Sequence, residues 1–184
     1  DNGIAHIAWE DYTAAQVEDI FRKAAAGERL SREAINRYKS AFLIEMAKLY
    51  KKYNFVMQLH IGTYLDANHR KVREIGQSTG FDCVDDSTAV KSVGQILDRL
   101  TELDHLPKTI LYPLNPAQME PFAVLAAGFC DGMVRGKVQL GAPWWFNDQL
   151  GELVERGEYF SDEKYLKDII EGICYRNVKE YFGW

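Results

Sequence analysis

The sequence predicts an α/β fold in which short parallel strands alternate with helices. Three short runs rich in apolar residues, at 55–61, 108–114 and 136–141, have the length and composition of buried strands. The segments around them carry apolar residues at three- and four-residue steps, as on one face of a helix. Strands separated by helices are typical of a parallel sheet covered by helices. No linker or internal repeat divides the chain, so residues 1–184 are predicted to form a single domain.

Two helices are predicted before the first strand. Thr13 and Gln16 have the spacing of a capping box, and Gly27 is placed to end the short helix that they begin. Ser31 is a favourable N-cap for the second helix, which leads directly into the strand at 55–61. One apolar stripe runs along this second helix and comprises Ile35, Tyr38, Phe42, Met46, Leu49 and Tyr53.

Residues 63–87 are polar and are predicted to form a loop that contains a short helix. Three further helices are expected at 87–104, 115–130 and 161–184. In the second of these, Asn115 is the cap and Pro116 lies in the first turn, while Pro121 predicts a kink or a later start. Ser161 is the predicted cap of the last helix.

Composition excludes several classes of function. The chain has 47% hydrophobic and 27% charged residues and a net charge of −5, which gives no electrostatic reason to expect nucleic acid or an anionic membrane as partner. Its three cysteines, Cys83, Cys130 and Cys174, are odd in number and far apart, which argues against a disulfide framework. No apolar run reaches the roughly 18–20 residues of a membrane span. A reducing cytoplasm is therefore the expected compartment.

The candidate site lies where the three strands end, because parallel α/β folds bind ligands beyond the carboxyl ends of their strands. The first strand ends with His60 followed by Gly62 and Tyr64, and the second with Tyr112 and Asn115. The third strand brings a set of amide, indole and carboxylate side chains, namely Gln139, Trp144, Trp145, Asn147 and Asp148. Packing alone would favour aliphatic residues at such positions.

Each of these side chains also has a structural interpretation. A histidine at a strand end is often a hydrogen-bonded structural residue, although imidazole equally suits acid–base or metal chemistry. Trp144 and Trp145 fit a core or an interface as well as a wall for a ligand. The sequence contains no H-x-H or H-E-x-x-H pair, no G-x-S-x-G elbow and no glycine-rich phosphate loop. A self-contained metal site and a nucleotide cradle are therefore not visible.

Four stretches together resemble the C-terminal half of glucuronate (uronate) isomerase. They are "VMQLHIG", "LPKTILYPLNP", "GKVQLGAPWWFNDQ" and "DIIEGICYRNVKEYF". Their order matches the family, as does the spacing of the first three, and the similarity extends from about Ser31 onward. The stretch that contains the paired tryptophans is the most specific of the four.

The resemblance implies part of a (β/α)8 barrel related to the amidohydrolases. It implies interconversion of D-glucuronate with D-fructuronate, and of D-galacturonate with D-tagaturonate, through an enediol. A divalent metal, typically zinc, is implied as the Lewis acid. His60 matches the family's fifth-strand histidine, a catalytic residue that faces metal and substrate and is itself a candidate metal ligand. Trp144 and Trp145 would wall the sugar pocket, with Asn147 and Gln139 binding hydroxyl groups.

The chain departs from the family pattern at three places. The H-x-H of the first strand is absent, and Asn2 stands where a histidine is expected. The aspartate and arginine motif of the eighth strand is also absent, so a segment is expected to be missing near 149–150. Without these groups the metal site cannot be completed, and the 184-residue chain alone is expected to be inactive.

Two alternatives remain beside the enzyme. The first is a non-catalytic half-barrel that serves as an oligomerising scaffold, because half a barrel leaves strand edges unpaired. For the same reason a homo-oligomer is expected in either case. The second alternative is an unrelated doubly wound domain that binds a sugar or a nucleotide, and the missing phosphate loop counts against it.

Overall fold

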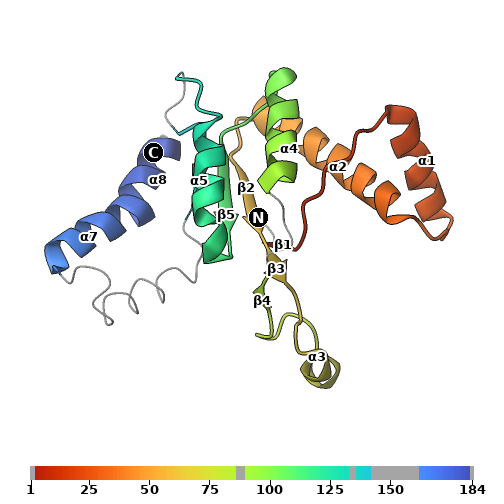
Figure 1. Cartoon of the computed structure of the whole chain (residues 1–184), viewed down its shortest axis with the longest axis horizontal. Helices are drawn as coiled ribbons and strands as arrows, with labels where there is room; N and C mark the ends of the chain where they lie inside the picture. Colours follow the sequence, from red (N-terminus) through yellow and green to blue (C-terminus); the bar gives the residue numbers. More distant parts are fainter. Residues whose placement is uncertain (1–2, 86–89, 133–135, 142–161, 183–184) are drawn as a thin grey trace.

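A parallel sheet of four strands lies at the centre of the chain. The computed structural model describes residues 3–85, 90–132, 136–141 and 162–182. The strands are β1 (Gly3–Ile4), β2 (Met57–Ile61), β5 (Thr109–Pro113) and β6 (Val138–Leu140), in the order β1-β2-β5-β6 (Figure 1). All three pairings are parallel. The order follows the sequence without the reversal that a doubly wound sheet requires, which favours a barrel.

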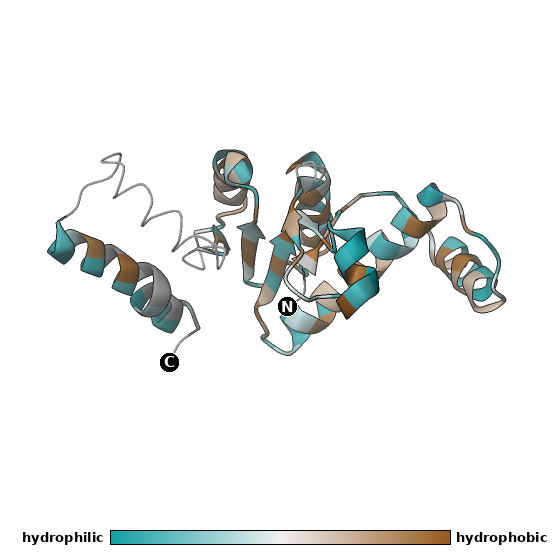
Figure 2. Cartoon of the chain, turned by 90° about the horizontal axis from the view of Figure 1, so that it is seen from below, coloured by the Kyte–Doolittle hydropathy of each residue, from teal (hydrophilic) through white to brown (hydrophobic). Residues whose placement is uncertain are grey.

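One face of this sheet is covered by helices. These are α2 (Arg32–Lys52), α4 (Val90–Glu102) and α5 (Met119–Ala127), and Figure 2 shows α4 and α5 on the same side of the strands. A 3₁₀ turn, η1 (Pro116–Gln118), precedes α5. The helix predicted at 115–130 therefore starts later, as Pro121 suggested, and Asn115 caps the turn by accepting a hydrogen bond from the amide of Ala117 at 3.0 Å.

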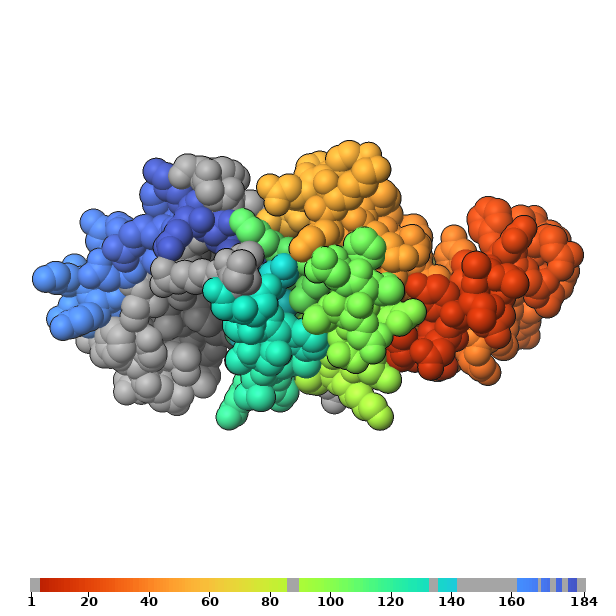
Figure 3. Space-filling model, turned by 90° about the horizontal axis from the view of Figure 1, so that it is seen from above, coloured from red at the N-terminus to blue at the C-terminus, as the bar shows by residue number. Residues whose placement is uncertain are grey.

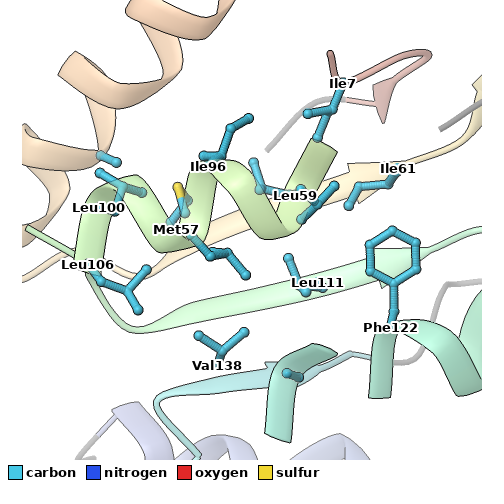
Figure 4. Packing of buried hydrophobic residues seen from close by; sticks show 14 of the residues in the cluster. Ile7, Met57, Leu59, Ile61, Ile96, Leu100, Leu106, Leu111, Phe122 and Val138 are labelled. Atoms are coloured by element: carbon cyan, nitrogen blue, oxygen red, sulfur yellow. The ribbon is translucent and has the colours of Figure 1, made fainter. Parts of the chain in front are cut away.

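The core lies between these helices and alternate residues of the strands. Met57, Leu59 and Ile61 on β2 are buried, whereas Gln58 and His60 between them are half-buried on the opposite face. Figure 4 shows the β2 side chains packed with residues from neighbouring helices and strands. Those partners include Ile96 and Leu100 of α4, Leu111 of β5, Phe122 of α5 and Val138 of β6. The period-two alternation therefore assigns one face to the core and leaves the other for a site.

The two N-terminal helices form as predicted. In α1 (Ala14–Ala25), Thr13 and Gln16 complete the capping box, and the Ser31 hydroxyl caps α2 by accepting from the amide of Ala34 at 3.1 Å. Figure 3 shows these helices at one end of an elongated molecule. The buried residues of α2 are small or on the other side from the predicted stripe: Ser40, Ala41, Ile44 and Ala47.

The predicted apolar stripe of α2 lies largely in solvent. Phe42 is 58% exposed, and Tyr53 is 60% exposed. Beside the stripe, a cavity of about 480 Å³ opens between α2 and the outer edge of β2, lined in part by Phe42, Met46 and Phe55. Within the described chain, β1 pairs only with His60 and Ile61, so no strand covers the lower part of this edge. The stripe and edge thus form an open apolar surface.

The loop predicted at 63–87 is more structured than expected. It contains two short antiparallel strands, β3 (Thr63–Tyr64) and β4 (Cys83–Val84), and the helix α3 (His69–Ile75). Gly62 begins this excursion with a positive φ of 87°, and its carbonyl accepts a hydrogen bond from the amide of Asp85 at 2.7 Å. A Cβ at Gly62 would lie 2.8 Å from the carbonyl oxygen of Asp85, so the position requires glycine.

The C-terminal segment forms α7 (Glu163–Glu171), a π-helical segment (Gly172–Arg176) and α8 (Asn177–Phe182). The predicted cap Ser161 lies outside the described residues, and the Asp162 carboxylate accepts hydrogen bonds from the amides of Lys164 and Tyr165. Tyr181 fixes α8 to the sheet, because its hydroxyl donates to the Lys137 carbonyl at 3.2 Å. Among the described helices, none is long and apolar enough to cross a membrane.

Candidate functional site

The face of the sheet turned away from the helices carries two rows of side chains. Strand register places Gln58 beside Ile110 and Ile110 beside Gln139, which gives the lower row. One step toward the carboxyl ends, His60 pairs with Tyr112 and forms the upper row. Side chains two residues apart on a strand share a face, so the two rows belong to the same surface.

His60 and Tyr112 are stacked on each other. Their ring centroids are 4.2 Å apart and the ring planes differ by 7°. The Tyr112 hydroxyl donates a hydrogen bond to Oε1 of Gln58 at 2.8 Å, which ties the upper row to the lower one. On the β6 side, a Cβ added to Gly141 would lie 2.0 Å from Cε1 of Tyr112. Glycine at 141 therefore makes room for the Tyr112 ring.

Burial shifts the titration of both rings. Desolvation lowers the pKa of His60 below its ordinary value, because the charged imidazolium loses hydration in this position. Desolvation also raises the pKa of the Tyr112 phenol. Near neutral pH the pair is therefore uncharged, and the imidazole is in the form that accepts a proton.

Of the predicted site residues, the structure describes the positions of His60 and Gln139, and these two lie at different levels of the sheet. His60 lies at the carboxyl end of β2, as expected. Gln139 lies in the lower row. Its amide oxygen lies near Gly136, toward the amino end of β6, and would be 3.0 Å from a Cβ added to Gly136. Trp144, Trp145 and Asn147 lie outside the described residues.

Two residues of the candidate site, Tyr112 and Gln58, have no role predicted from the sequence. Tyr112 was expected at the strand end without a function, and Gln58 was assigned to the buried strand. The signal for Gln58 was present in the sequence, because it lies two positions before His60 and must share its face. No feature of the neighbouring sequence indicates that position 141 requires glycine, because the requirement comes from the Tyr112 ring on another strand.

A metal centre does not assemble from these residues alone. In the ranges that the structure describes, no three His, Cys, Asp or Glu side chains gather in a group that could hold a metal ion. The ring stacked on His60 is a phenol, and the hydroxyl of that phenol bonds to an amide. Both groups are poor zinc ligands beside imidazole, thiolate or carboxylate. The described residues therefore do not fit a zinc site by themselves.

Comparison with known sequences identifies the family. A sequence model of the family described as glucuronate isomerase matches residues 1–151. The chain belongs to the glucuronate isomerase family. The uronate isomerase of Lachnospira eligens is 33% identical over 230 residues, covering 100% of this chain and 49% of the relative. That of Clostridium perfringens is also 33% identical, over 228 residues, covering 99% of this chain and 49% of the relative.

Solved structures of the glucuronate isomerase family agree with the fold. The uronate isomerase of Thermotoga maritima superposes with a TM-score of 0.67 at 28% identity, over 78% of this chain and 30% of that chain. The glucuronate isomerase of Caulobacter crescentus gives a TM-score of 0.63 at 27% identity, over 78% and 29% of the two chains. The predicted fold class is confirmed: the parallel strands and their helices are part of a (β/α)8 barrel. The chain spans about half the length of the curated relatives that it matches.

Proposed function

We propose that the complete protein to which this chain belongs is an aldose–ketose isomerase that converts D-glucuronate to D-fructuronate and D-galacturonate to D-tagaturonate. The family match over residues 1–151 is the observation that carries this proposal. Both curated relatives described above are uronate isomerases, and the two solved neighbours bear uronate or glucuronate isomerase names. The reaction moves a proton between C1 and C2 through an enediol.

His60 is the residue to which we assign proton transfer. It is half-buried at the carboxyl end of a barrel strand, where barrel enzymes place catalytic groups. Its lowered pKa keeps the imidazole neutral near pH 7 and thus able to accept a proton from a substrate carbon or hydroxyl. The stacked Tyr112 ring contacts the face of the imidazole rather than its edge.

The remaining substrate contacts are assigned from the order of residues in and after β6. Trp144 and Trp145 would cover the apolar carbon face of the sugar, and Asn147 and Gln139 would bind its hydroxyl groups. For Gln139 this requires the amide to turn from Gly136 toward the carboxyl end of β6. A divalent ion, with zinc expected, would draw its ligands from residues beyond those described, because the described ones hold no such group.

Two observations support the missing segment near 149–150. The alignment with the Lachnospira eligens enzyme runs over 230 residues, although this chain has 184. The family match also stops at residue 151. We therefore propose that the 184-residue chain alone is inactive and that activity belongs to the complete protein, acting on small uronate sugars in the cytoplasm.

The deciding experiment is a coupled assay of glucuronate isomerisation on the complete gene product and on the 184-residue chain. We expect turnover in the first and none in the second. His60→Ala in the complete protein should lower kcat by about 10²–10⁴, the usual contribution of a positioned acid–base group. His105→Ala, at an exposed position, is the matched control and should leave kcat unchanged. A complete protein without turnover, or an unaffected His60→Ala, would contradict the proposal.

A second candidate function is an oligomerising half-barrel, favoured by the open surface beside β2. Four parallel strands are half of the eight that close such a barrel. Two copies related by a twofold axis along the barrel would place β6 of each against the β1–β2 edge of the other. The exposed Phe42 and Phe55 would then be buried. In this case the partner is a second copy of the chain.

Size-exclusion chromatography with light scattering tests whether the chain forms the dimer that the scaffold requires. We expect a dimer, and we expect Phe42→Glu with Phe55→Glu to yield a monomer because charge would enter the apolar contact. Ile75→Glu is the control, since Ile75 is 58% exposed on α3, in the excursion between β3 and β4 (Figure 1). A monomeric wild-type chain would exclude the second copy and leave the surface to the rest of a longer barrel.

A further inference from the structure

We propose that Tyr112 is a positioning residue that sets the plane of the His60 imidazole for proton transfer. The proposal deepens the proposed isomerase function and rests on it. Torsion about the Cβ–Cγ bond of histidine has broad minima, so an imidazole at a strand end does not fix its own plane. The nearly parallel stack, with centroids 4.2 Å apart and planes within 7°, supplies that constraint.

The Tyr112 ring is itself held from two sides. Its hydroxyl donates to Oε1 of Gln58 at 2.8 Å, which fixes the far end of the ring over the lower row. Gly141, next in register after the Leu111–Leu140 pair, leaves room for the ring edge, because a Cβ would approach Cε1 to 2.0 Å. The Tyr112 ring therefore lies between Gln58 on β2 and Gly141 at the end of β6. A change at either residue that moves the ring would also move the imidazole stacked on it.

The stack acts on the face of the imidazole. The Tyr112 ring covers that face in a nearly parallel arrangement, so it restricts rotation of the imidazole about its Cβ–Cγ bond. Catalytic groups need their geometry held within roughly 10–20° of the productive orientation, and ring contact is a means of achieving this on a rigid strand.

Two substitutions distinguish the contribution of the Tyr112 ring from that of its hydroxyl group. Tyr112→Phe keeps the stacked ring and loses the hydrogen bond to Gln58, whereas Tyr112→Leu removes the ring. In the complete protein we expect Tyr112→Leu to lower kcat by about 10²-fold, the scale of a misplaced catalytic group, with a smaller change in KM. Tyr112→Phe should recover most of that loss. Tyr175→Leu, at an exposed tyrosine, is the matched control.

A second test, by proton NMR spectroscopy, does not depend on turnover. Protons above the face of an aromatic ring are shielded, so the His60 ring protons should resonate upfield in the 184-residue chain. His60→Gln assigns the signals. We expect the upfield shift to persist in Tyr112→Phe and to vanish in Tyr112→Leu. Should Tyr112→Leu not fold, Gly141→Ala provides the second test, because its methyl group must displace the ring and move the same signals.

The outcomes distinguish the two proposals. Unshifted His60 signals in the wild-type chain, or equal kcat losses in Tyr112→Phe and Tyr112→Leu, would overturn the positioning role of the Tyr112 ring. A wild-type complete protein that does not isomerise glucuronate would instead overturn the isomerase function, and the resonance shifts would still report whether the stack exists.

Discussion

Removal of the Ser40 hydroxyl should weaken the attachment of the N-terminal segment to α2. Ser40 is 1% exposed, and its Oγ accepts a hydrogen bond from the amide of Glu10 at 3.0 Å. The same hydroxyl donates to the carbonyl of Asn36 at 2.9 Å or that of Ala8 at 3.2 Å. These contacts join residues 8–10, which lead from β1, to the middle of the helix.

The expected loss follows from counting what one hydroxyl can do. It carries one proton, so at any moment it makes one accepted and one donated bond, each with a net contribution of about 1 kcal/mol. In Ser40→Ala the Glu10 amide also loses its acceptor, while alanine favours the helix by about 0.5 kcal/mol. We therefore expect the free energy of unfolding to fall by about 1–2 kcal/mol.

Urea unfolding followed by far-UV circular dichroism measures this change as a lower midpoint at constant slope. Ser92→Ala is the matched control, because Ser92 is a half-buried serine inside α4 for which no side-chain hydrogen bond is seen among the described residues. It should change stability by less than about 0.5 kcal/mol. Equal effects of the two substitutions would refute the reasoning, since helix propensity would then explain both.

Three further outcomes are expected from the packing and the strand ends. Leu111→Ala should cost about 3–5 kcal/mol in urea unfolding, because Leu111 is fully buried in a central strand; a loss below about 1 kcal/mol would contradict that packing. Gly62→Ala should cost about 1–3 kcal/mol through its positive φ and its contact with Asp85, and wild-type stability would argue against both. Burial raises the pKa of Tyr181, so its phenol adds stability that is complete below pH 10 and is lost as pH rises beyond that value. Tyr181→Phe should therefore lose less stability than wild type between pH 9 and pH 11, and parallel pH profiles would count against this assignment.

The elements that the sequence predicts well are those with a local cause. The capping box at Thr13 and the N-cap at Ser31 are satisfied within three residues, so their signals survive in the fold. The late start of α5 follows equally locally from Pro121. The apolar character of 55–61 and 108–114 predicted β2 and β5, and their alternation with helices predicted a parallel sheet.

What the sequence could not predict depends on partners distant in the chain. The α2 stripe has the spacing of a buried face, yet its residues lie in solvent because small residues, including Ala41 and Ala47, contact the core instead. The position of His60 was predicted, but the Tyr112 ring that stacks on it is 52 positions away and came without an assigned role. Strand register, which no local pattern fixes, brings the two together.

The closed base of the excursion between Gly62 and Asp85 separates it mechanically from the barrel. Both strands of its stem leave from one point, where the Gly62 carbonyl and the Asp85 amide meet at 2.7 Å. Insertions or deletions within 65–82 would therefore change the length of the arm without shifting β2 against its neighbours. The arm is thus a place where relatives can diverge in size while keeping the imidazole-bearing strand in register.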